Sequence, residues 1–238
     1  MYKITSTAPG RICLFGDHQD YLKLPIIACA INRYIKLDAI ENGNDFFEIY
    51  LPDLNDKLNL PLIIDKYDIV KNDFLRSGLK VVYDLGIKPN KGFSVTINSK
   101  IPINGGLSSS SAFTIVWINF LISAYAPDYD LDSSRLVNLA YNAEVKEHNS
   151  SGGKMDHNTI VFGNTIYLDT KSNKVFPLKK IGLELVVGVS GQKKNTLSTI
   201  SHIKDKTEKS LKSLKNKFTN FNINDVNEES IEKIIQMV

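Results

Sequence analysis

The chain has 238 residues, 42% of them apolar and 23% charged, and a net charge of +3. This is an ordinary globular composition, long enough to bury a core as one large or two smaller domains, and the small net charge argues against nucleic acid or a membrane as a partner. No apolar run approaches the length of a membrane span, about 18 residues, and no signal peptide is recognised. The two cysteines, Cys13 and Cys29, match no metal-ligand spacing. We therefore expect a soluble cytoplasmic protein.

The N-terminal part of the chain alternates short apolar segments with turn residues, a pattern that predicts strands. Residues 52–64 are expected to form a loop, and Asn42-Gly43-Asn44 predicts a hairpin turn. A helix is expected from Asp65 or Asp68, as its N-cap, to about Leu85. The expected strands are Tyr2–Thr7, Arg11–Phe15, Ile26–Ile31, Tyr34–Glu41, Phe46–Leu51 and Phe93–Ile97.

The rest of the chain alternates predicted helices with short strands. A polar stretch at Lys171–Lys180 indicates a domain seam, so we expect a first domain at residues 1–172 and a second at residues 173–238. The expected helices are Ser108–Ala124, Asp132–His148, a long basic amphipathic helix from Asn195 to about Phe218, and one beginning near Glu228. The expected strands are Thr159–Phe162, Thr165–Asp169 and Leu183–Ser190.

A turn of small residues opens the first of these helices. Pro102 to Ser111 read Pro-Ile-Asn-Gly-Gly-Leu-Ser-Ser-Ser-Ser. Two glycines let the backbone approach a ligand closely, and the free N–H groups at a helix start attract anions. The plainer alternative is a turn followed by helix-capping serines. Because four successive serines give up helix propensity, we favour a cradle for a triphosphate.

A second cluster follows the strand that holds Arg11. This strand ends in Gly16, and Asp17, His18 and Asp20 come directly after it. Carboxylates gathered in this way accept hydrogen bonds from the hydroxyls of a polyol. A solvated turn with an ion pair at the strand end is the alternative.

A third cluster pairs Glu144, on an expected helix, with Asp156, twelve residues later and after a Ser-Ser-Gly-Gly loop. A helix carboxylate can help to hold Mg²⁺, which prefers oxygen ligands, and a loop carboxylate can lie beside a reacting hydroxyl. The alternative is that Glu144 and Glu147 belong to an exposed helix face.

Together the three clusters resemble the GHMP small-molecule kinases. Pro102 through Ala112 resembles the family's phosphate-binding motif Pro-x-x-x-Gly-Leu-Ser-Ser-Ser-Ala-Ala, with Ser111 in place of the first alanine. The opening resembles the galactokinase branch: Ala8-Pro9-Gly10-Arg11 is followed by Gly16-Asp17-His18-Gln19-Asp20-Tyr21, with Asp in place of Glu and Gln in place of Thr. Gly153-Lys154-Met155-Asp156 resembles the branch's Gly-Ile-Met-Asp.

The resemblance implies an α+β, two-domain GHMP kinase fold. The N-terminal ATP-binding domain would be a ribosomal-protein-S5-like mixed α/β domain, and the C-terminal domain an α/β sandwich. The family usually runs longer and ends with a Gly-rich motif facing the phosphates. The chain stops at Val238 without such a motif. We therefore expect residues 173–238 to be an incomplete second domain and the chain to be truncated.

The resemblance also implies roles for individual residues. Asp156 matches the catalytic aspartate, which takes or orients the proton of the accepting hydroxyl, and Arg11 matches the arginine that pairs with it. Ser110 and Glu144 match the magnesium ligands. The sugar-binding positions are Asp17, His18, Asp20 and Gly153, and the phosphate cradle comprises Gly105, Gly106, Leu107, Ser108, Ser109 and Ser110.

The implied reaction is transfer of the γ-phosphate of ATP, with Mg²⁺, to a hydroxyl of a monosaccharide, the C1 hydroxyl by resemblance to galactokinases. A mevalonate-type or heptose kinase of the same family is one alternative. An inactive sensor of sugar and ATP, or a truncated product that binds without turnover, is another. Lys154 either favours an acidic sugar or points to solvent. The expected partner is a small-molecule sugar, without nucleic acid or membrane, and the sequence does not indicate the oligomeric state.

Overall fold

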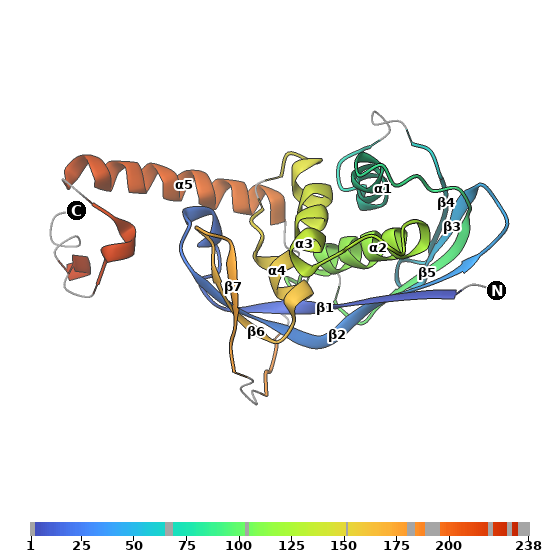
Figure 1. Ribbon diagram of the computed structural model, residues 1–238. Helices are drawn as coiled ribbons and strands as arrows, with labels where there is room; N and C mark the ends of the chain where they lie inside the picture. The colour runs from blue at the N-terminus through green and yellow to red at the C-terminus, as the bar shows by residue number, and fades with distance from the viewer. Residues whose placement is uncertain are drawn as a thin grey trace. The chain divides into compact units, whose positions relative to one another are not determined.

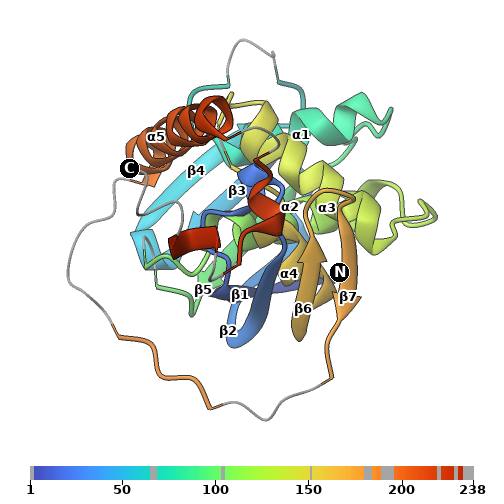
Figure 2. The ribbon, with the colours of Figure 1, turned by 90° about the vertical axis from the view of Figure 1, so that its left-hand side faces the viewer.

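The computed structural model describes residues 3–64, 69–102, 105–150, 152–179, 184–188, 196–218, 221–227 and 230–232. The chain divides into two compact units, Met1–Lys194 and Asn195–Val238, which are described separately. The first unit is a mixed α/β structure with one sheet and helices α1 to α4 on one side of it (Figures 1 and 2).

The sheet of the first unit has seven strands in the order β4-β3-β5-β2-β6-β7, and β1 pairs with β2 off this path. All pairs are antiparallel except β3 with β5, which run parallel. The strands are β1 (Lys3–Phe15), β2 (Ile26–Glu41), β3 (Phe46–Leu51), β4 (Asp56–Pro61), β5 (Phe93–Ser99), β6 (Thr165–Asp169) and β7 (Lys174–Pro177).

The strand predictions are confirmed in part. β3 and β6 have the predicted bounds, whereas β1 and β2 are each one long strand where two were predicted. The predicted loop at 52–64 is wrong, because β4 lies within it and pairs with β3. Asp56, Lys57 and Asn59 make β4 polar, as an edge strand can be, and this polarity hid it from the sequence pattern.

The predicted hairpin at Asn42-Gly43-Asn44 is also wrong, because β5 lies between β2 and β3. The Asn42 N–H donates to the carbonyl oxygen of Gly92 (3.2 Å), and the Gly92 N–H donates to that of Asn44 (2.7 Å). A Cβ on Gly92 would lie 2.2 Å from the Phe46 carbonyl oxygen, so only glycine fits there. The turn is therefore hydrogen-bonded to the segment that leads into β5.

Among the described residues, four helices cover the sheet: α1 (Phe74–Asp84), α2 (Ser109–Tyr125), α3 (Ser133–Tyr141) and α4 (Met155–Phe162). Asp73, which accepts a hydrogen bond from the Arg76 N–H, is the N-cap of α1. The predicted caps of this helix, Asp65 and Asp68, lie outside the described residues. The described residues also form short helical turns at Asp20–Leu22 (η1), Pro52–Leu54 (η2) and, with π-helical geometry, Asn142–Lys146 (η4).

Helix α4 overturns the strand predicted at Thr159–Phe162. The β-branched residues Thr159, Ile160 and Val161 favour strands, but here they belong to a packed helix. Thr159 is fully buried, and its hydroxyl donates to the Met155 carbonyl oxygen (2.8 Å). Tertiary burial has therefore outweighed local propensity.

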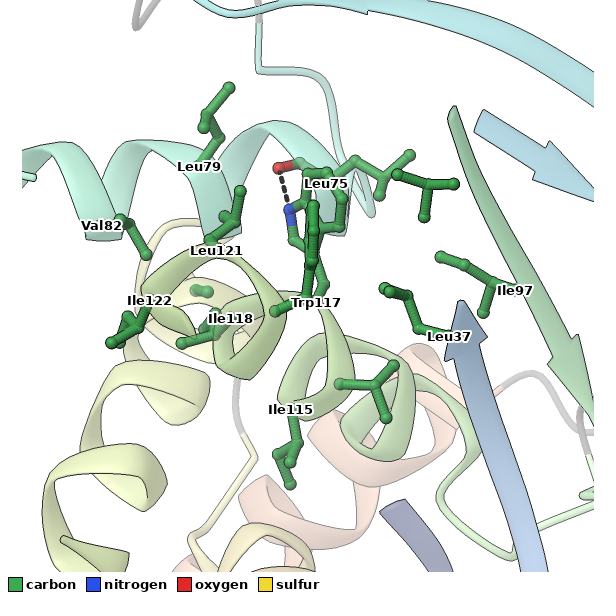
Figure 3. Close-up of a cluster of buried hydrophobic side chains, with 14 of the residues drawn as sticks. Leu37, Leu75, Leu79, Val82, Ile97, Ile115, Trp117, Ile118, Leu121 and Ile122 are labelled. Carbon is green, nitrogen blue, oxygen red and sulfur yellow. Dashed lines mark hydrogen bonds between the residues drawn. The ribbon is translucent and has the colours of Figure 1, made fainter. Parts of the chain in front are cut away.

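Trp117 of α2 belongs to the main core, and its indole lies against α1 (Figure 3). Its indole nitrogen donates to the Leu75 carbonyl oxygen (2.9 Å), and its ring packs edge-on against Phe47 at 5.2 Å. Helix α2 is apolar on nearly every side because it is buried on nearly every side. The core therefore fixes the position of this helix, whose first residues belong to the serine-rich turn.

The second unit contains α5 (Thr196–Lys217) and the short turn η5 (Ile223–Asp225). The predicted basic helix is confirmed from Thr196, and Glu228, where another was predicted to begin, lies outside the described residues. In the part of the chain that the structure describes, no helix combines the length and apolarity that crossing a membrane requires.

The segment between the last strand and α5 differs from its prediction. Residues 184–188 form no strand, and Val186 is 98% exposed, so the buried strand predicted at Leu183–Ser190 is wrong over these residues. The remaining residues of that range, at its two ends, lie outside the described residues. β7 pairs with β6 and so extends the first sheet past residue 172. The domain boundary between residues 172 and 173 stays a prediction.

Candidate active site

Arg11 and Asp156 are far apart in the chain and adjacent in space. Arg11 comes from β1 and Asp156 from the first turn of α4. The guanidinium Nε donates to Asp156 Oδ1 at 2.7 Å. β1 changes register between Pro9 and Arg11, and irregularities of this kind re-aim a side chain. The Asp156 side chain remains 27% exposed, so an incoming molecule can reach its carboxylate.

The serine-rich turn is bound to the same arginine. Arg11 donates twice to the turn, from its backbone N–H to the Leu107 carbonyl oxygen (3.2 Å) and from Nη1 to that of Gly106 (2.7 Å). A Cβ on Gly10 would lie only 3.0 Å from the Leu107 carbonyl oxygen, so β1 and the turn are in close contact. Two of the three clusters found in the sequence therefore converge on Asp156.

The residues predicted to form the phosphate cradle lie around the start of α2. Gly105 packs against Pro102, and Gly106 has a φ of +76°, which glycine adopts without strain. Ser109 and Ser110 form the first turn of the helix, where backbone N–H groups and the macrodipole attract an anion. Ile103 and Asn104 lie outside the described residues.

Ser108 is the N-cap of α2 and has an unusual backbone. Its φ of 58° and ψ of 47° place it in the left-handed region, at a cost of about 1–3 kcal/mol for a residue other than glycine. Its hydroxyl makes no capping bond to the helix and donates instead to Asp156 Oδ2 at 2.5 Å. Both oxygens of Asp156 therefore accept hydrogen bonds from charged or polar donors.

These contacts determine the charge of the pair. Burial alone would raise the pKa of Asp156, but the nearby charge of Arg11 and the hydrogen bonds from Arg11 and Ser108 hold it below its ordinary value. Burial likewise opposes the charge of Arg11, and the carboxylate of Asp156 outweighs it and raises the arginine pKa. At neutral pH the site therefore holds a carboxylate beside a guanidinium.

The loop after β1 approaches the residues that precede Asp156. Gly16 has a φ of +89°, and the chain then passes through Asp17 and His18 to Asp20 in η1. A Cβ on Gly153 would lie 1.7 Å from Asp20 Oδ2, so the Asp20 carboxylate packs directly on the glycine backbone. Asp17 is 61% exposed, and its Oδ2 is 3.8 Å from His18 Nε2. The predicted sugar-binding residues thus lie on two segments that meet near Asp156.

Glu144 lies in the π-helical turn η4, a kind of irregularity that is frequent at functional sites. Its Oε2 is 2.8 Å from His157 Nε2, but the two atoms do not have hydrogen-bonding geometry. Oε2 and both ring nitrogens of His157 are buried without a hydrogen-bond partner among the described residues. Buried polar atoms without partners require an explanation, and a bound cation is one.

Glu144 fits one ligand of a magnesium ion, because a buried carboxylate oxygen that has no hydrogen-bond partner among the described residues suits a hard cation. Among the described residues, no group of three His, Cys, Asp or Glu side chains could hold a metal. Mg²⁺ commonly takes one or two protein oxygens and completes its shell with water and substrate phosphates. The residues present therefore fit a magnesium ion that binds together with a nucleotide.

Two residues near the site were missed or left open by the sequence. His157 was not singled out, although it follows Asp156 directly, and its ring packs edge-on against Tyr141 at 5.8 Å. The Lys154 ammonium donates to Asn138 Oδ1 (2.7 Å) and lies 5.1 Å from the centre of the Tyr141 ring. Lys154 is thus held by residues of α3.

Comparisons with known proteins show what the chain is similar to. Residues 73–164 match the model of the GHMP kinases N terminal domain, and residues 2–37 match the galactokinase galactose-binding signature. The chain is 32% identical over 199 residues to a galactokinase of Thermotoga maritima, covering 81% of this chain and 54% of that protein. It is 28% identical over 203 residues to a mevalonate kinase of Thermococcus sibiricus, covering 82% of this chain and 59% of that protein.

A solved structure shows the same fold. The galactokinase of Lactococcus lactis, solved in complex with galactose, superposes with a TM-score of 0.77 at 19% identity, covering 99% of this chain and 63% of that one. The chain spans about half the length of the curated relatives that it matches.

Proposed function

We propose that this chain acts as a galactokinase-like sugar kinase, transferring the γ-phosphate of ATP to a hydroxyl of a monosaccharide. Its matches to the model of the GHMP kinases N terminal domain and to the galactokinase galactose-binding signature support the proposal. One observation carries the proposal. Arg11, Asp156 and the serine-rich turn meet in a single hydrogen-bonded cluster, although they come from three distant parts of the chain.

In the proposed mechanism Asp156 receives or orients the proton of the attacking hydroxyl. Its depressed pKa keeps it ionised, so it can accept a hydrogen bond from the sugar. Arg11 holds one carboxylate oxygen and places a positive charge where negative charge develops during transfer. Phosphoryl transfer depends mainly on positioning and charge neutralisation, which this cluster supplies.

We assign the sugar hydroxyls to Asp17, His18 and Asp20, with Gly153 contributing its backbone. The contact between Asp20 and Gly153 supports this assignment, because it brings an acceptor of hydrogen bonds close to Asp156. By likeness to galactokinases, we propose the C1 hydroxyl as the acceptor.

We assign the phosphates of ATP to the turn Gly105–Ser110 and a magnesium ion to Glu144 and Ser110. The magnesium ion would neutralise phosphate charge. Glu144 would supply a carboxylate oxygen and Ser110 a hydroxyl at the first turn of α2. The partner in this proposal is a small-molecule sugar, and a cytoplasmic location stays a prediction.

Mevalonate is the second candidate acceptor, since a mevalonate kinase is among the relatives. The match of residues 2–37 to a galactose-binding signature favours the sugar. An inactive sensor would bind sugar and ATP without turnover, and the intact pair of Arg11 and Asp156 argues against it.

The test is phosphoryl transfer from ATP to a panel of galactose, other hexoses, a heptose phosphate and mevalonate. We expect turnover with one sugar, and we expect Asp156→Asn to lower kcat by about 10²- to 10⁴-fold while ATP still binds. Asp84→Asn, on an exposed part of α1, is the control and should leave kcat unchanged. Turnover of mevalonate alone, or full activity of Asp156→Asn, would contradict the proposal.

A further inference from the structure

We propose that Ser108 is a positioning residue that holds the Asp156 carboxylate in its reactive orientation, in addition to lining the phosphate cradle. The inference rests on the proposed function, since it concerns the same site. It assigns to one serine of the motif a role in the acceptor half of the reaction.

The first observation is what Ser108 does not do for its helix. A serine at an N-cap ordinarily adopts an extended backbone and bonds its hydroxyl to an N–H of the first turn. Ser108 has left-handed dihedral angles instead, and its hydroxyl makes no bond to α2. The backbone of this residue is therefore strained, and its side chain does not cap the helix. Strain of this kind persists where surrounding structure demands it, often at functional sites.

The second observation is where the hydroxyl goes. Ser108 Oγ donates to Asp156 Oδ2 at 2.5 Å, while Arg11 Nε donates to Asp156 Oδ1 at 2.7 Å. A hydrogen bond to a charged acceptor at this distance is among the stronger ones in proteins. Donors on both oxygens, from the start of α2 and from β1, prevent the carboxylate from rotating about its last bond.

The third observation is that the two donors are tied together. Arg11 Nη1 donates to the carbonyl oxygen of Gly106, two residues before Ser108. The turn that would bind phosphate thus contacts Arg11 through the Gly106 carbonyl oxygen and Asp156 through the Ser108 hydroxyl. Movement of the turn would shift both groups at once, which couples the phosphate cradle to the acceptor carboxylate.

The test compares Ser108→Gly with Ser108→Ala. Both remove the hydroxyl, but only glycine also relieves the left-handed backbone, so the two variants separate orientation from folding. We expect both to lower kcat by about 10- to 100-fold with little change in the KM for ATP. We expect Ser108→Gly to unfold at the same temperature as the parent chain or above it, and Ser108→Ala to unfold no higher than the parent.

Asn72→Gly is the matched control. Asn72 also has a left-handed backbone near a helix start (φ 67°), directly before Asp73 at the N-cap of α1. This variant tests a backbone substitution at a position outside the site. We expect it to leave kcat unchanged.

A readout that does not need turnover is the titration of the Asp156 carboxyl carbon by NMR, assigned with Asp156→Asn. We expect the Asp156 pKa to be below its ordinary value in the parent chain and to rise in Ser108→Gly. Among the described residues, the other titratable groups that face this region are Arg11 and Cys13 on β1, Asp17 and Asp20 after β1, and His157 on α4. All of them are unchanged in the variant.

The outcomes separate the two proposals. If no acceptor is phosphorylated but the Asp156 pKa still rises in Ser108→Gly, the proposed function fails and the positioning role stands. If Ser108→Gly keeps its kcat within twofold and its Asp156 pKa, the positioning role is overturned. Loss of ATP affinity alone in both variants would likewise overturn it and leave Ser108 as a cradle residue.

Discussion

Gly153→Ala adds one methyl group at the contact between the Asp156 segment and the loop after β1. That methyl carbon would lie 1.7 Å from Asp20 Oδ2, far inside any contact that real Cβ atoms make. Extending the distance to 3.0 Å requires Asp20 or the glycine backbone to move by about 1.3 Å, and a misplacement of about 1 Å in a catalytic site costs up to about 100-fold in rate. We expect kcat/KM for the sugar to fall by about 10- to 100-fold with ATP affinity unchanged.

The neighbouring glycine provides the control. Among the described residues, a Cβ on Gly152 would meet only the Val145 side chain, at 3.3 and 3.9 Å, so Gly152→Ala requires a shift of tenths of an ångström. The assay is steady-state kinetics with the sugar varied at saturating ATP, together with ATP binding by calorimetry and thermal unfolding of both variants. If Gly153→Ala kept the kcat/KM of Gly152→Ala, the place of Asp20 and Gly153 in the acceptor site would be refuted.

Two further predictions concern charge. Glu144→Gln should weaken Mn²⁺ binding in the presence of ATP by about tenfold or more, because a neutral amide is a poor ligand for a hard cation. EPR measures this binding as the fraction of free Mn²⁺. Unchanged binding would exclude Glu144 as a ligand. The folded-state pKa of Asp156 lies below its ordinary value of 3.8, so its contribution to stability is present above about pH 3.8 and is lost as pH falls through the folded pKa. Urea unfolding should therefore show the parent chain more stable than Asp156→Asn at pH 7, with the difference shrinking below pH 4, and a constant difference would contradict the role of the charge.

Local sequence signals determined several elements of this fold. The short runs rich in apolar and aromatic residues at Phe46–Leu51 and Thr165–Asp169 predict β3 and β6 with their observed bounds. The apolar run after the serines predicts α2 to within one residue at each end. These signals succeed because the side-chain pattern itself reports which faces are buried.

Other elements depended on contacts that no local pattern reports. β5 is inserted between β2 and β3, so Asn42-Gly43-Asn44 does not close a hairpin, although the local turn signal is the same. The β-branched residues of α4 favour a strand, and burial of Thr159 made them helical. Strand order and the choice between helix and strand at such positions are determined by long-range packing.

The candidate site likewise has features that the sequence indicates and features that only long-range contacts determine. The residue types in the sequence singled out the serine-rich turn and Asp156, because small hydroxyl residues and carboxylates have recognisable chemical uses, and the resemblance to the GHMP kinases paired Arg11 with Asp156. Only the tertiary structure decided that Ser108 donates to Asp156 and that His157 lies against Glu144. Those contacts require a left-handed backbone at the start of α2 and the packing of α4 beside α3, and both are set by segments remote in the chain.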